Sequence, residues 1–167
     1  STDIDSEVAI NTFIQQTDFY TLYKLPISYS FQNRFRNGEM PVGMSDLYGF
    51  YNMMAVFAPE LKGLWSFTEV PGTVKEDGTI DRSVVTTVSS CVMLANAKNK
   101  ENAWKFMSWW TDTEAQTDFG LEIESVLGAA GRYNSANKEA VKNLNWTKAE
   151  LDVIMAQWEN VIGYPEM

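Results

Sequence analysis

The residues best suited to chemistry in this chain are aromatic rings that stand beside short polar side chains. Asp46 is followed by Tyr48 and Tyr51, and Trp65 lies shortly before the next turn. An aromatic ring stacks on the C–H face of a sugar, while a neighbouring carboxylate or amide takes the sugar hydroxyls. Aromatic residues also fill protein cores, and that is the commoner case. These residues alone leave both interpretations open.

Arg132 is a second candidate, because it follows a run of small residues, 128–131. A guanidinium offers five N–H donors in one plane, which suits vicinal hydroxyls or a carboxylate. A surface arginine would give the same pattern, so this loop does not decide between the two.

Several kinds of enzyme are disfavoured by what the chain lacks. It has no histidine and a single cysteine, Cys91, which excludes His-based triads, His metal ligands, an internal disulfide and Cys-cluster zinc sites. Cys91 stands in an apolar, β-branched run and is predicted to be buried. Glu122 and Glu124 are two residues apart on a predicted helix, so they face different ways and cannot act as a glycosidase pair. We expect a protein that is not an enzyme and that has no cofactor and no metal site.

The length and the net charge of the chain limit the kinds of partner that it can bind. The chain has 167 residues, enough for one domain with a real core, and 13 basic against 22 acidic residues give a net charge of −9. Such an acidic chain repels phosphate backbones, so we expect no nucleic-acid partner.

Hydrophobic periodicity and capping residues predict an α/β chain that is rich in helix and has few strands. Trp104, Phe106, Trp109 or Trp110, and Trp158 fall on helical faces, which predicts that they belong to the core. Helices are predicted over 5–25, 28–35, 46–58, 99–110, 111–125, 137–144 and 147–162, and strands over 41–44, 65–70 and 84–94.

Several stretches together resemble one family. The stretch 35–43, followed by Asp46 and Tyr48, resembles the extracellular solute-binding proteins of ABC sugar importers, the maltose-binding-like class (family 1). Further stretches that are similar to this family follow in the same order, at 71–73, 84–94, 99–110, 113–116 and 128–133.

The resemblance implies a periplasmic-binding-protein-like (type II) fold, in which two α/β lobes close on a ligand. It covers only the C-terminal half of such a protein. Residues 1–88 would then be a second-lobe segment. Residues 89–131 would hold the interlobe crossing and helices that normally pack on the first lobe, and residues 132–167 would return to the second lobe with the C-terminal helices.

The same resemblance implies the substrate-binding component of an ABC importer, with a sugar or oligosaccharide held non-covalently between the lobes and ABC permease subunits as partners. The full-length protein would be extracellular, either a membrane-anchored lipoprotein or periplasmic, and one lobe alone would bind weakly or not at all. Tyr48 stands where the family usually has Trp, which gives less stacking area and one more hydroxyl. The expected ligand-binding residues are Asp46, Tyr48, Tyr51, Trp65, Ser89, Ser90, Arg132 and Tyr133.

Three alternatives remain. One is a peptide- or polyol-binding member of the same superfamily, with Arg132 and Asp46 as charged anchors. Another is a helical protein–protein interaction module, which would show a flat exposed apolar patch. The third is a hydrolase with facing buried carboxylates, whereas a sugar site would show an aromatic-floored cleft.

Overall fold

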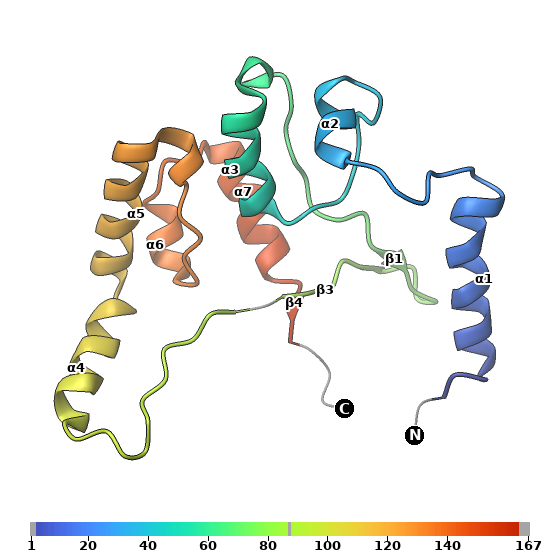
Figure 1. Ribbon diagram of the computed structural model, residues 1–167. Helices are drawn as coiled ribbons and strands as arrows, with labels where there is room; N and C mark the ends of the chain where they lie inside the picture. The colour runs from blue at the N-terminus through green and yellow to red at the C-terminus, as the bar shows by residue number, and fades with distance from the viewer. Residues whose placement is uncertain (1–2, 87, 164–167) are drawn as a thin grey trace. The chain divides into compact units, whose positions relative to one another are not determined.

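The computed structural model describes residues 3–86 and 88–163, and it is helix-rich, with 51% of the chain helical and few strands. This confirms the expected coarse class (Figure 1). The described α-helices are α1 (Glu7–Thr21), α2 (Phe31–Arg36), α3 (Leu47–Phe57), α4 (Lys100–Trp110), α5 (Thr113–Leu127), α6 (Lys138–Lys142) and α7 (Lys148–Trp158). Short 3-10 helices are η1 (Pro59–Leu61) and η2 (Gly128–Gly131), and the strands are β1 (Thr73–Val74), β2 (Ile80–Asp81), β3 (Val84–Val85) and β4 (Val161–Ile162).

Most of the helices begin where capping side chains predict, although α2 begins after Ser30 and was predicted from residue 28. Asp46 accepts a hydrogen bond from the Gly49 backbone at the start of α3, and Thr147 forms a complete capping box with Glu150 at the start of α7. The predicted capping box at Thr111 is wrong, because Asp112 caps α5 instead. The Thr111 hydroxyl donates to a carbonyl of the preceding helix and is therefore occupied.

Two predicted strands, 41–44 and 65–70, are wrong, because the structure has no strand there. In the predicted strand 84–94, only β3 forms among the described residues, and it pairs in parallel with β4. β1 and β2 pair antiparallel as a hairpin. An apolar, β-branched run becomes a strand only where another backbone segment pairs with it. The pairing segment lies elsewhere in the chain, so the local sequence pattern does not reveal it.

The chain divides into two compact units, one ending at Gly43 and the other beginning at Met44. The first unit contains α1 and α2. α1 has no buried side chain, and the Phe31 and Phe35 rings of α2 pack at 5.6 Å between centroids.

The second unit contains the hydrophobic core and all of the site described below. Val141, Leu144, Trp146 and Ile154 form the buried centre of this core, at and between α6 and α7. α5 lies beside α6 in Figure 1, and its Leu121 packs against the centre. Other partly buried residues against the same centre are Leu47, Tyr48, Tyr51, Phe67, Tyr133, Leu151 and Trp158.

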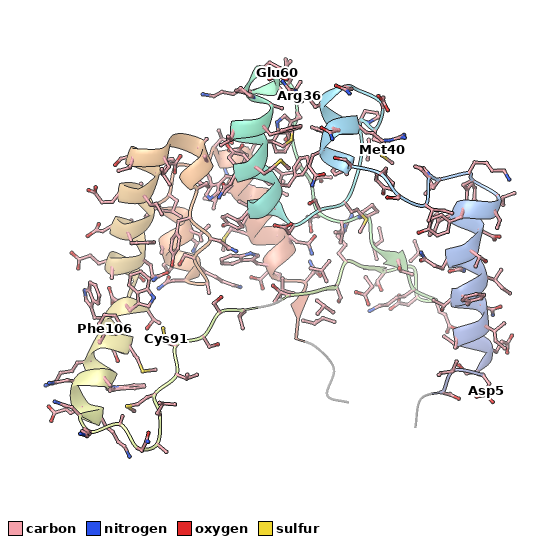
Figure 2. The ribbon with its side chains drawn as sticks, in the orientation of Figure 1. Asp5, Arg36, Met40, Glu60, Cys91 and Phe106 are labelled. Carbon is pink, nitrogen blue, oxygen red and sulfur yellow. The ribbon has the colours of Figure 1, made fainter. Side chains whose placement is uncertain are left out.

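The prediction that the α4 aromatics belong to the core is wrong for Trp104, Phe106 and Trp109, because all three side chains are exposed. Figure 2 labels Phe106 on α4 and Cys91 on the segment that precedes α4. Cys91 is also exposed, contrary to prediction. Helical spacing identifies an apolar face, but it does not say whether another element covers that face.

No helix in the described ranges is long and apolar enough to cross a lipid bilayer.

Candidate functional site

An aromatic cluster centred on Trp146 is the main feature of the second unit. Trp146 is 9% exposed. Its ring lies 5.7 Å from that of Tyr48, 5.1 Å from Tyr51 and 6.1 Å from Phe67, each near edge-to-face. Trp65 extends the cluster, with its ring 5.8 Å from Tyr51 and 5.5 Å from Phe50. These are favourable geometries for aromatic pairs.

Local sequence explains how the rings reach one another. Tyr48 and Tyr51 are three residues apart on α3 and therefore share a face. Trp146 immediately precedes the Thr147 cap of α7, and Leu151 stands at the fourth helical position. An apolar residue before the cap packs on the residue at that position, an arrangement known as a hydrophobic staple. The helix start therefore directs Trp146 toward the core.

A cavity of about 440 Å³ lies against this cluster. Tyr51, Trp65 and Phe67 supply aromatic walls, and Glu150 supplies a carboxylate. Lys62 and Ser66 also line it, which adds an ammonium and a hydroxyl. Small-molecule sites are typically apolar hollows of roughly 300–1,000 Å³ with a few polar groups, and this cavity has that character.

Glu150 has one carboxylate oxygen to spare. Its Oε2 accepts from the Thr147 backbone N–H at 2.9 Å and from the Thr147 hydroxyl at 2.8 Å, which completes the capping box. Among the described residues, Oε1 has no hydrogen bond or ion pair. The cap thus fixes the carboxylate and leaves an acceptor for a ligand hydroxyl.

Tyr48 is held in an environment that disfavours its ionised form. Burial raises the pKa of Tyr48 to about 12, while the Arg132 charge and the Trp146 indole N–H act in the opposite direction. Neither the Tyr48 hydroxyl nor the Trp146 Nε1 completes a hydrogen bond of good geometry with the described residues. Burial also raises the pKa of Tyr51. Both phenols are neutral donors near neutral pH.

Arg132 is buried, at 7% exposure, and its Nη2 donates to Glu124 Oε1 at 2.7 Å. Its Cζ lies 4.4 Å from the centroid of the Trp146 ring and 5.2 Å from that of Tyr51. Sequence predicted an arginine that faces a ligand. The structure places it beneath the rings, paired with Glu124, while Glu122 on the same helix is exposed.

The structure separates the predicted site residues into three groups. Tyr48, Tyr51, Trp65 and Arg132 lie together in the cluster. Asp46 caps α3, the helix that carries Tyr48 and Tyr51, and its side chain is exposed. Tyr133, Ser89 and Ser90 form the third group.

Tyr133 turns toward α5 instead, where its hydroxyl donates to Gln116 Oε1 at 3.1 Å and its ring packs on Phe119. Ser89 and Ser90 lie in an exposed segment between β3 and α4. In the described part of the chain, they make no hydrogen bond to the cluster.

Sequence reasoning missed six residues of the site, namely Lys62, Ser66, Phe67, Glu124, Trp146 and Glu150. The sequence contains a local signal for Trp146: an apolar residue before a capping box, with Leu151 at the fourth helical position, predicts a hydrophobic staple. It contains no such signal for Glu124, because the partner of Glu124 is Arg132, which lies outside α5.

The cluster and its cavity can bind a ligand by ring stacking and hydrogen bonding. Facing buried carboxylates, which a hydrolase would need, do not occur among the residues that line the cavity. Comparison of the chain with family models, curated proteins and solved structures found no match in any of the three.

Proposed function

We propose that this chain belongs to the substrate-binding component of an ABC importer and binds a sugar or oligosaccharide non-covalently. The observation that carries the proposal is the cavity with Tyr51, Trp65 and Phe67 in its walls. The C–H faces of a pyranose stack on such rings, and its hydroxyls need nearby donors and acceptors. Glu150, Lys62 and Ser66 supply those groups at the same cavity.

The resemblance to maltose-binding-like proteins supplies the rest of the proposal. Residues 1–88 and 132–167 would belong to the second lobe of a type II binding protein, outside the cell or in the periplasm, and residues 89–131 would hold the interlobe crossing and the helices that normally pack on the first lobe. The loaded protein would deliver its ligand to the permease. Asp46, Ser89, Ser90 and Tyr133 would reach the ligand only in the closed, two-lobed state. A second lobe contributes contacts in this scheme, so we expect this chain to bind weakly by itself.

Ligand-detected NMR is suited to weak binding and therefore tests the proposal. A panel of neutral mono- and oligosaccharides is mixed with the chain, and saturation transfer to the sugar C–H protons is measured. We expect transfer for at least one sugar, its loss in Trp65→Ala and its retention in Trp104→Ala. Trp104 is a matched control, because it is an exposed tryptophan on α4. Absence of transfer across the panel, or equal loss in both variants, would refute the sugar site.

A second candidate is the protein–protein interaction module, and the exposed α4 aromatics favour it. Trp109, Trp110 and Phe119 line a hollow of about 480 Å³. The same hollow is lined by four acidic residues, Asp112, Glu114, Asp118 and Glu122. Apolar rings with an acidic rim suit a protein surface that is apolar and basic.

Reciprocal variants separate the two candidates. An amphipathic basic peptide is titrated against the chain at low and high salt, with tryptophan fluorescence as the signal. The interaction module predicts salt-sensitive binding that Trp109→Ala abolishes and Trp65→Ala leaves intact. Binding that survives Trp109→Ala would contradict it.

A further inference from the structure

Arg132 ties three segments of the second unit together. Its side chain forms an ion pair with Glu124 of α5, whose own side chain is only 10% exposed. Its backbone carbonyl accepts a hydrogen bond from Asn52 Nδ2 of α3 at 2.9 Å. Its guanidinium also lies over the Trp146 ring, just before α7. The residue is thus fixed at both its backbone and its side chain.

The rings provide an important part of the environment of this buried charge. Arginine is almost never buried without a partner, since removing a cation from water is costly. Glu124 occupies Nη2, but the Nε and Nη1 atoms of Arg132 have no hydrogen-bond partner among the described residues. The faces of Tyr51 and Trp146 are close enough for cation–π attraction, which is strongest where water is excluded.

Arg132 does not itself line the cavity, whereas Tyr51 does. Arg132 can therefore influence a ligand in the cavity through the Tyr51 ring that it contacts. A planar guanidinium can stack on a ring while one edge bonds a carboxylate, and a lysine ammonium cannot do both in this way.

We propose that Arg132 is a positioning residue that, with Glu124, holds the Tyr51 ring against Trp146 in the orientation that a ring-stacking ligand in the cavity requires. This inference rests on the proposed sugar site for its ligand. The orientation of the rings can be measured without a ligand.

A double-mutant cycle tests whether Arg132 acts through Tyr51. We expect Arg132→Lys to weaken sugar binding about fivefold in the wild-type chain, but less than about twofold in the Tyr51→Ala background. A residue that touches the sugar directly would produce the same fold-change in both backgrounds, and that result would overturn the proposal. Lys148→Arg serves as the control, because it also exchanges one cationic side chain for the other, here in an exposed i,i+4 ion pair with Asp152.

Near-ultraviolet circular dichroism provides the ligand-free measurement. We expect Arg132→Lys to reduce the tyrosine and tryptophan bands while the far-ultraviolet spectrum stays at the wild-type level. Glu124→Gln is the second variant: it leaves the cation in place, and we expect a smaller change in the same direction. Near-ultraviolet spectra unchanged in both variants would overturn the positioning role. Failure of the wild-type chain to bind any sugar, with the spectral changes present, would instead refute the proposed function.

Discussion

Trp146 should be the tryptophan on which the stability of the second unit depends most strongly. It is 9% exposed and contacts three other rings and the Arg132 guanidinium. Truncating a buried Phe or Trp to Ala costs about 3–5 kcal/mol, through lost burial and the cavity that remains. The contacts around Trp146 place Trp146→Ala at the upper end, about 4–5 kcal/mol. Small domains have only about 5–15 kcal/mol in total, so this variant should be close to unfolding.

Urea denaturation followed by far-ultraviolet circular dichroism measures the loss, since this signal reports helix. Trp104→Ala is the matched control: its side chain is 62% exposed, and we expect a change below about 1 kcal/mol. Trp146→Phe keeps a ring in place and should cost about 1–2 kcal/mol, which keeps the test informative if the alanine variant does not fold. Equal losses for Trp146→Ala and Trp104→Ala, or a loss below about 1.5 kcal/mol for Trp146→Ala, would refute this account of the core.

Three further predictions concern single residues, Gln116, Thr147 and Tyr48. Gln116 is buried, accepts a hydrogen bond from the Ser135 hydroxyl at 2.8 Å and donates one to the Trp110 backbone carbonyl at 2.6 Å. Gln116→Leu should therefore lower the free energy of unfolding by about 2–3 kcal/mol. A change below about 0.5 kcal/mol in urea denaturation would contradict this. Thr147→Ala removes half of the capping box with Glu150 and should cost about 1 kcal/mol, measured by thermal unfolding, whereas an unchanged midpoint would count against the cap. Burial raises the pKa of Tyr48 from 10.0 to about 12 in the folded chain, so the unfolded chain loses the phenol proton at a lower pH. The free energy of unfolding should therefore fall by about 2–3 kcal/mol as pH rises from 10 to 12. Tyr48→Phe should remove that part of the pH dependence, and an unaltered slope in the variant would contradict the assignment.

The helices were largely predictable because their signals are local. A capping side chain such as Asp46 or Thr147 bonds a backbone N–H only two or three residues away, so both partners are visible in one short window. The strands were not, since the partner of β3 is β4, more than seventy residues later in the chain. Local pattern predicts an extended backbone but not its neighbour.

The candidate site was predictable in part for the same reason. Tyr48 and Tyr51 share a helical face, and Trp65 follows a short distance along the chain. Trp146 and Arg132 join these rings from distant segments, and the Asn52–Arg132 hydrogen bond spans 80 residues. Arg132 was identified as important, but its pairing with Glu124 and its burial depend on how α3 and α5 are arranged around η2.

The sequence by itself determined where the helices begin, which of their faces are apolar, and which aromatic residues near Asp46 are candidates for a ligand. Only the tertiary structure decided that the α4 tryptophans Trp104 and Trp109 are exposed while Trp146 is buried. The physical reason is that burial is a property of pairs of surfaces. A sequence segment determines its own apolar face, whereas the element that covers that face comes from elsewhere in the fold.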